Sequence, residues 1–272
     1  MRHEEVVATT HAYLDTSHGQ VHVEGSGRPG SPLVVLLAQW PFPTAIYRRL
    51  LPVLGGSCHA VAVDLPGFGG SPAPRRALSV AENAQVVLDV VAALPARDAV
   101  LFARAASTVV ASTAAEQDPA TIKALFLHGP FAHGADERAT KRRHAWSAPE
   151  VVADGGHLLD CWERVRGRYP QLSLEMTNVC ALAHAAAAPV QAQAYRSVWD
   201  VDNQAVLRRL HQPVHALVGR DEVLGRLVEH YPPNLRLVGG SPRAGTTDFM
   251  AIDAPVELAD LVLELVAVPS AP

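Results

Sequence analysis

The sequence predicts an α/β protein with a mostly parallel, doubly wound sheet and an inserted helical cap. Continuous apolar runs such as "PLVVLLA" and "HAVAVD" are typical of strands covered on both faces. They alternate with segments of helical spacing, which favours parallel strands joined by helices. From Phe131 to roughly His211 the chain becomes polar, rich in Arg and His, and helical in pattern. Because such sheets bind ligands at the carboxyl ends of their strands, we expect this segment to cover that edge.

The first half of the core follows from local patterns. The segment "HAYLDTSHGQVHVEGSG" alternates about a Ser-His-Gly turn and predicts a β-hairpin. "PLVVLLA" predicts a buried strand, and "AIYRRLLPVL" predicts a helix by its spacing. "HAVAVD" predicts the next buried strand, which ends in the loop "LPGFGGSPAP".

The remaining core elements are predicted in the same way. "SVAENAQVVLDVVAAL" begins with a Ser cap and repeats apolar residues at helical spacing. "AVLFA" and "IKALFLHGP" predict two buried strands before the inserted segment. "PVHALVG" and "LRLVGG" predict two more strands after it.

These elements define the expected domain organisation. The C-terminal "VELADLVLELVA" predicts an amphipathic helix that closes the core. We therefore expect a core formed by residues 1–130 and 212–272. Residues 131–211 are expected to form the helical cap over the active-site cleft.

Composition excludes several classes of partner. The chain has 272 residues, a formal net charge of −4 and no long run of one charge sign, so neither nucleic acid nor a membrane surface is expected as a partner. No apolar run reaches the roughly 18 residues of a membrane span, and the first residues do not resemble a signal peptide. The three cysteines suit a reducing compartment, so we expect a cytoplasmic protein. The sequence leaves open whether it is a monomer or a homodimer. The 13 histidines lack metal-ligand spacing, so we expect no metal and no cofactor.

The segment "AVLFARAASTVVASTAAEQDP" predicts a strand, a tight turn and a helix. This layout carries the nucleophile in one class of hydrolase, where a Ser, Cys or Asp stands at the apex of the turn. Ala105 stands at that apex here.

"AVAVDLPGFGGSPAP" is close to an Asp-x-Pro-Gly-x-Gly-x-Ser strand-and-turn signature. With "LLAQWPFPTAIYRRLLPVL" and "ALVGRDEV", it resembles the α/β-hydrolase fold proteins of the epoxide-hydrolase and haloalkane-dehalogenase branch. The resemblance covers nearly the whole chain and implies the α/β-hydrolase fold. It also implies an oxyanion loop near Gln39 and a catalytic acid after the strand in "ALVGRDEV".

The catalytic positions of that branch depart from its pattern. The elbow reads Ala-Arg-Ala-Ala-Ser over residues 103–107, in place of Gly-x-nucleophile-x-Gly. The His-Gly of the oxyanion loop is replaced by Ala38 and Gln39. Asp248 falls where the general-base histidine is expected, because the last histidine of the chain, His230, precedes the final strand. The resemblance implies a retained acid at Glu222, or at its neighbour Asp221.

Three residues are therefore candidates for catalysis: Asp248, Arg104 and Glu222. A carboxylate above an apolar cleft suits proton transfer, although Asp248 could equally cap a turn in solvent. Arg104 could pair with Asp248 or Glu222, bind an anionic ligand oxygen, or form a purely structural ion pair. Glu222 could join such a network or remain a solvated loop carboxylate.

Further residues are expected to contact substrate. Gln39 offers an amide donor, His128 ends a strand at the ligand-binding edge, and the cap aromatics suit a flat apolar ligand. Some of these side chains are equally suited to packing roles. The candidate substrate-binding residues are Gln39, Trp40, Ala105, Ala106, His128, Trp146, Trp162 and Tyr195.

These observations leave three functional hypotheses. The favoured one is a cofactor-independent enzyme that binds a hydrophobic, polycyclic small molecule and catalyses a non-covalent acid–base reaction. Cyclisation, carbon–carbon bond formation and epoxide opening in secondary metabolism are the reactions implied by the resemblance to nucleophile-free members of this fold. The alternatives are a non-catalytic ligand carrier or sensor, and a hydrolase with a displaced nucleophile such as Ser107. Ser107 is expected to point away from the site, because it lies two residues past the apex.

Overall fold

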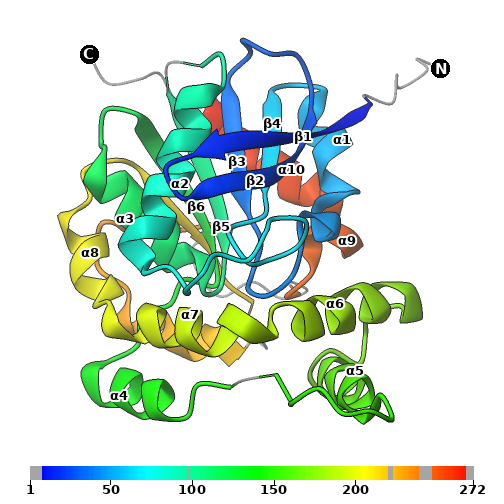
Figure 1. The fold of residues 1–272 in the computed structure, drawn as a ribbon. Coiled ribbons are helices and arrows are strands. Elements are labelled where there is room, and N and C mark those ends of the chain that lie inside the picture. Colours follow the sequence, from blue (N-terminus) through cyan, green and yellow to red (C-terminus); the bar gives the residue numbers. More distant parts are fainter. Residues whose placement is uncertain (1–7, 97, 147, 220–222, 239–246, 268–272) are drawn as a thin grey trace.

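The computed structural model describes residues 8–96, 98–146, 148–219, 223–238 and 247–267. Its centre is an eight-stranded sheet in the order β1-β2-β4-β3-β5-β6-β7-β8, in which β1 and β2 are antiparallel and the strands from β4 to β8 are parallel (Figure 1). The strands are β1 Thr9–Thr16, β2 Gly19–Ser26, β3 Leu33–Leu37, β4 His59–Val63, β5 Ala99–Arg104, β6 Ile122–His128, β7 Val214–Leu217 and β8 Leu235–Leu237.

Helices cover both faces of the sheet, which explains the continuous apolar runs of its central strands. Along β3, Val35 and Leu37 join one hydrophobic core, whereas Val34 and Leu36 join the other. Alternate side chains of a strand point to opposite faces, so a strand buried on both sides must be apolar throughout. The flanking helices are α1 Leu50–Gly55, α2 Val80–Ala93, α3 Ser107–Gln117, α9 Met250–Asp253 and α10 Pro255–Val266.

The start of α2 confirms the predicted Ser cap. The Ser79 hydroxyl accepts a hydrogen bond from the Glu82 backbone N–H, and the Glu82 carboxylate accepts one from the Ser79 backbone N–H at 2.8 Å. This reciprocal pair is a capping box, which satisfies N–H groups that otherwise lack partners at a helix start.

The helix predicted for "AIYRRLLPVL" differs in detail. A 3-10 turn, η1 (Thr44–Tyr47), comes first, and α1 begins separately at Leu50. Pro52 explains the break, because a proline clashes with the carbonyl of the residue four positions earlier and cannot lie inside a continuous helix. In the first turn of α1 its missing N–H costs no hydrogen bond.

The segment between β6 and β7 contains α4 Ala135–Arg143, α5 Gly156–Arg168, α6 Leu174–Ala186, α7 Ala188–Asp200 and α8 Asn203–Arg209. Figure 1 shows α4 to α7 as a layer beyond one end of the sheet, the end at which β6 leads into the segment. The last helix, α8, packs against α3 beside the sheet. We therefore propose α4 to α7 as the cap within the 131–211 segment.

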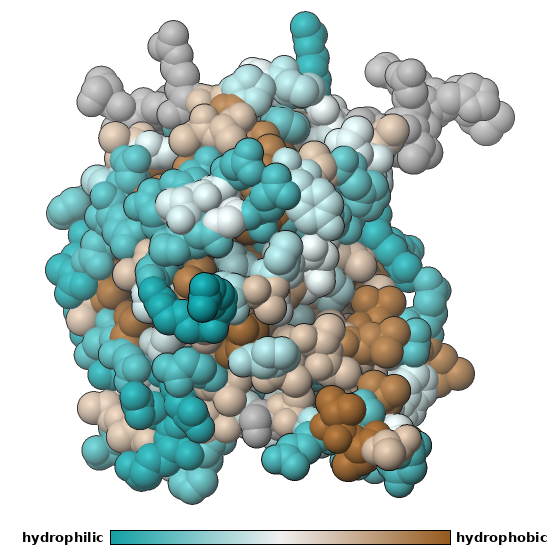
Figure 2. Space-filling model, viewed as in Figure 1, coloured by the Kyte–Doolittle hydropathy of each residue, from teal (hydrophilic) through white to brown (hydrophobic). Residues whose placement is uncertain are grey.

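The outer face of this layer changes character along its length. α4 has no buried residue and consists mainly of charged side chains. Figure 2 shows apolar side chains gathered at the opposite end, over α5 and α6. The exposed apolar residues of that region are Val151, Val152, Leu158, Leu159, Leu174 and Leu182. Among the described residues, no helix combines the length and apolarity needed to cross a bilayer.

Candidate active site

The predicted strand–turn–helix elbow is present, with a methyl group at its apex. β5 ends at Arg104, Ala105 adopts a left-handed backbone with φ of 51°, and α3 begins at Ser107. The Ala105 N–H donates to the His128 carbonyl at 3.0 Å, which fixes the turn to the end of β6. A left-handed conformation costs an L-residue roughly 1–2 kcal/mol, so surrounding contacts must hold this turn. Ala105 lines the large cavity of the protein.

Ser107 is directed away from this cavity, as its position predicts. Its side chain is fully buried, and its hydroxyl donates to the Ala38 carbonyl on the loop that follows β3. The hydroxyl therefore ties the elbow helix to the end of the neighbouring strand.

Arg104 and Asp248 form an ion pair at the edge of the cavity. The Arg104 side chain is 4% exposed and Asp248 is 22% exposed. The Arg104 guanidinium binds the Asp248 carboxylate, donates from Nε to the Asp248 carbonyl at 3.3 Å, and donates from Nη1 to the His128 carbonyl at 3.4 Å. Among the described residues, Asp248 is the predicted partner that Arg104 contacts, and Glu222 lies outside them. The arginine thereby holds the segment preceding α9 against the ends of β5 and β6.

Gln39 and Trp40 form the opposite wall, on the loop after β3. The Gln39 amide donates to the Tyr169 hydroxyl at 3.3 Å. Trp40 stacks on Phe68 with ring centroids 5.0 Å apart, and its carbonyl accepts a hydrogen bond from the Tyr195 hydroxyl at 2.6 Å. These bonds connect the loop to the helical layer above it.

Ala106 follows the apex of the elbow and is buried in the core. It is the N-cap of α3, and N–H groups at a helix start lack acceptors within the helix. In this fold the N–H that follows the apex of the elbow faces the developing negative charge of the substrate. In this chain that N–H belongs to Ala106.

The cavity between the strand ends and the helical layer has a volume of about 550 Å³. Aromatic side chains supply much of its wall. The rings of Phe131, His133 and Trp199 lie pairwise 5.1 Å apart and nearly parallel. The Trp146 ring contacts His184 edge-on at 4.9 Å. Flat rings in these orientations suit a flat ligand, and the volume suits a small molecule rather than a polymer.

The structure brings together most of the predicted site residues. Those that line the cavity are Gln39, Trp40, Arg104, Ala105, Trp146, Tyr195 and Asp248. The side chains of three others lie elsewhere: Ala106 is buried in the core, His128 faces a small void beside Phe102 and Phe249, and Trp162 packs on the core cluster under α5. Glu222 and Asp221 lie outside the described residues.

Sequence reasoning missed several lining residues, most of them in the helical layer. A spacing of four residues could have found two pairs, Arg164 with Arg168 and Gln191 with Tyr195, because such positions share one helix face. The missed lining residues are Phe131, His133, Thr140, Lys141, His144, Ala145, Arg164, Arg168, Tyr169, His184, Gln191, Leu224 and Arg226.

Two buried histidines of the cavity are neutral at pH 7. Burial, with the Arg164 charge adding to it, lowers the pKa of His184 to about 4. Burial is also the main cause that lowers the pKa of His133 to about 4, although the Glu137 carboxylate opposes it. The Gln191 amide lies 3.1 Å from His184 Nδ1. Their lowered pKa values make His184 and His133 weak proton acceptors at pH 7, so both serve the cavity as neutral rings.

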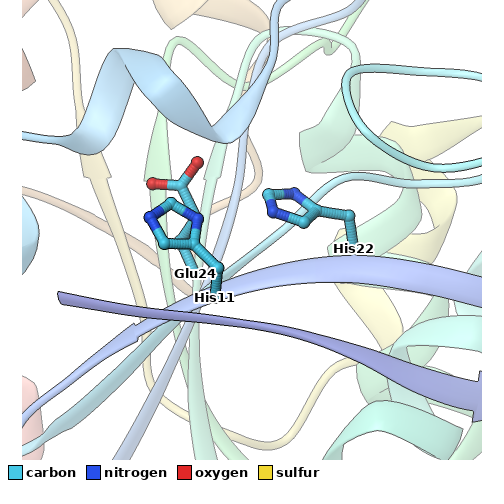
Figure 3. A group of neighbouring side chains, drawn as sticks. All are labelled: His11, His22 and Glu24. Carbon is cyan, nitrogen blue, oxygen red and sulfur yellow. The ribbon is translucent and has the colours of Figure 1, made fainter.

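A second polar cluster lies on the hairpin, outside the residues that line this cavity. His11, His22 and Glu24 come from β1 and β2, and their ligand-type atoms lie within 4.8 Å of one another (Figure 3). Sequence spacing does not show this group, because the antiparallel register pairs His11 with Glu24. His22 Nδ1 binds the buried Asp64 carboxylate at 2.9 Å, and Glu24 accepts from the Thr44 hydroxyl at 2.6 Å.

The partners of Asp64 indicate a structural role for this cluster. Asp64 accepts backbone N–H bonds from Thr44 at 2.7 Å and from Gly70 at 2.9 Å. Burial raises the pKa of the Asp64 carboxyl, while these hydrogen bonds and His22 oppose the rise. The cluster therefore fastens the hairpin to η1 and to the loop after β4.

Comparison with known proteins agrees with this architecture. The sequence pattern of the α/β hydrolase fold family matches residues 32–206. A haloalkane dehalogenase of Mycobacterium marinum is 27% identical over 93% of this chain and 90% of its own. An uncharacterized hydrolase of Saccharomyces cerevisiae is 33% identical over 69 residues, 25% of this chain and 24% of that protein. The crystal structure of an epoxide hydrolase from Vigna radiata superposes with a TM-score of 0.75 at 18% identity, covering 95% of this chain and 97% of that one. The chain belongs to the α/β-hydrolase fold family.

Proposed function

We propose that this protein is a cofactor-independent enzyme that uses the cavity of the α/β-hydrolase fold without forming a covalent intermediate. The substrate is a hydrophobic, polycyclic small molecule, and the reaction is an acid–base step such as cyclisation, carbon–carbon bond formation or epoxide opening in secondary metabolism. A cytoplasmic location, to which the three unpaired, buried cysteines are suited, is part of the proposal. The observation that carries it is the methyl group of Ala105 at the apex of the elbow.

Covalent hydrolysis needs a nucleophile activated by a base within hydrogen-bond reach. Among the described residues that line the cavity, neither Ser nor Cys occurs, and the hydroxyl groups are those of Thr140, Tyr169 and Tyr195. Tyr195 donates to the Trp40 carbonyl, and burial raises the pKa of its hydroxyl well above the usual range. Ser107 is fully buried on the far side of the turn. These arrangements support a mechanism that proceeds without acyl or alkyl transfer to the protein.

Asp248 is the proposed catalytic group. Its partly exposed carboxylate can accept a proton or a hydrogen bond from a substrate hydroxyl, and Arg104 acts as the positioning residue that fixes its direction. Gln39 and the Ala106 backbone N–H can stabilise charge that develops on a substrate oxygen. Holding the substrate in a reactive conformation between aromatic walls supplies the remaining rate enhancement.

The first test is the intact mass of the protein after treatment with a fluorophosphonate, with cleavage of 4-nitrophenyl butyrate followed in parallel. We expect neither an adduct nor cleavage above the buffer rate, under conditions that label a serine hydrolase completely. Ser107→Ala is the matched control. An adduct in the wild type that this variant lacks, together with ester cleavage, would make the protein a hydrolase with a displaced nucleophile and refute the proposal.

The second test addresses the acid–base step once a turned-over substrate is found. Asp248→Asn is expected to lower kcat by about 10²–10⁴-fold, the usual contribution of a positioned proton-transfer group. Unchanged kcat in a folded variant would remove Asp248 from the mechanism.

A non-catalytic ligand carrier is the second candidate, favoured by the engagement of the Asp248 carboxylate with Arg104. A carrier would bind its ligand tightly, and the ligand would be recovered chemically unchanged after prolonged incubation.

A further inference from the structure

The cavity lining carries many more cations than anions. Among the described residues, Asp248 is the acidic side chain of the lining, and it binds Arg104. The basic side chains of the lining are Arg104, Lys141, Arg164, Arg168 and Arg226. The chain as a whole has a net charge of −4, so this concentration of positive charge is local.

Part of this positive charge is neutralised from outside the lining. The Glu137 carboxylate lies 2.6 Å from Arg226 and 3.8 Å from Lys141. Arg164 and Arg168 form no ion pair with any carboxylate of the described residues; the Arg164 guanidinium lies 3.9 Å from the Trp146 ring centroid, and Arg168 donates to the Tyr169 hydroxyl at 3.3 Å. Two accessible guanidinium groups therefore line the cavity without a carboxylate partner in the described part of the chain.

The two groups repel each other in the free protein. Arg164 and Arg168 lie four residues apart on α5, and like charges at this spacing destabilise a helix. Burial, with the charge of Arg168 adding to it, lowers the pKa of Arg164. A guanidinium stays protonated in proteins nonetheless, so both groups remain charged. An arrangement that costs the free protein stability is expected where a ligand supplies the missing charge.

We infer that Arg164 and Arg168 bind a carboxylate of the substrate while its flat apolar part lies against Trp146, Tyr195 and Trp199. This inference rests on the proposed function, because it assigns the same cavity to the substrate. A planar guanidinium donates parallel hydrogen bonds to both oxygens of a carboxylate, and the partly water-excluded cavity strengthens that attraction. The substrate class is therefore a polycyclic or extended aromatic carboxylic acid, held by its anionic end at the cap.

The experiment compares two probes of the same shape, 1-pyrenebutyrate and the uncharged 1-pyrenebutanol. Each is titrated with the full chain and followed by fluorescence anisotropy in low salt. The variants are Arg164→Gln, Arg168→Gln and the double variant. Arg143→Gln is the matched control, because Arg143 is an exposed arginine of α4 that bonds only the Thr140 hydroxyl among the described residues and does not line the cavity. Circular dichroism confirms that each variant is folded.

We expect the wild type and Arg143→Gln to bind the carboxylate more tightly than the alcohol by about 100-fold or more, the product of the two losses expected below. Each cavity substitution should weaken carboxylate binding by about 10- to 100-fold, the value of a charge-assisted hydrogen bond. Affinity for the alcohol should stay constant, so the double variant binds both probes equally.

Equal affinity of the wild type for both probes, or a preference that survives in the double variant, overturns the inference. In either case binding of the alcohol leaves the proposed function standing. If neither probe binds, both the carboxylate site and the cavity as a polycyclic-ligand site are refuted.

Discussion

Removing the Asp248 charge should destabilise the protein through the arginine that it leaves behind. Arg104 is nearly fully buried, and beside the Asp248 carboxylate it also donates to the carbonyls of Asp248 and His128. Removing one partner of a buried ion pair lowers the free energy of unfolding by about 3–5 kcal/mol. Because Asp248 is 22% exposed, we expect the lower end of this range, about 3 kcal/mol, for Asp248→Asn. For a chain of this size that loss lowers the melting temperature by about 6–12 °C.

A double-mutant cycle separates the pair from its surroundings. Urea unfolding of Asp248→Asn, Arg104→Met and the double variant gives the coupling energy, which we expect to be about 1–3 kcal/mol because the two groups are in direct contact. Effects that add to within about 0.5 kcal/mol would refute the reasoning, since the two side chains would then be energetically independent. The activity of Asp248→Asn should be measured well below its lowered melting temperature.

Three further changes test other parts of the structure. Ala105→Gly should raise the free energy of unfolding by about 0.5–1 kcal/mol. Glycine relieves the strain of the left-handed backbone at φ 51°, and this gain exceeds the extra chain entropy that glycine loses on folding. A lower melting temperature would contradict this prediction. Ser79→Ala should lower the free energy of unfolding by about 1 kcal/mol in urea through loss of the cap on α2, and no change would show that the capping box contributes nothing. Because burial lowers the pKa of His184 from 6.5 to about 4, the unfolded chain binds more protons between these values, so stability falls as the pH drops through that window. His184→Gln should reduce that fall by up to about 3 kcal/mol in unfolding experiments from pH 7 to pH 4, and an unchanged pH dependence would refute the assignment.

Much of the fold could be predicted because its signals are local. The central strands are buried on both faces, so their apolar runs are continuous and end where the strands end. The Ser79 cap and the elbow at Ala105 are likewise set by residues adjacent in the chain. The exception, the break between η1 and α1, was also marked locally by Pro52.

The functional site was predictable only where it lies on the core. Arg104, Ala105 and Gln39 could be placed because each lies at or just beyond the carboxyl end of a recognisable strand. The helical layer has no strand end from which to judge which side chains face the cavity. Trp162 was therefore expected to line it, but Trp162 packs on the core, and Arg164 and Arg168 of the same helix line the cavity instead. A turn of about 100° per residue separates positions two apart by more than half a circle, and only the docked helix shows which face points inward.

The sequence by itself determined the α/β class, the order of the strands in the chain and the alanine at the apex of the elbow. Tertiary structure alone decided that Arg104 contacts Asp248, 144 residues later in the chain, and that two guanidinium groups of α5 line the cavity with no described carboxylate as partner. It also assembled His11, His22 and Glu24 across a strand pair. The physical reason is range: burial patterns, caps and turns act between neighbouring residues, whereas ion pairs and cavity walls form between segments that meet only after the helices dock on the sheet.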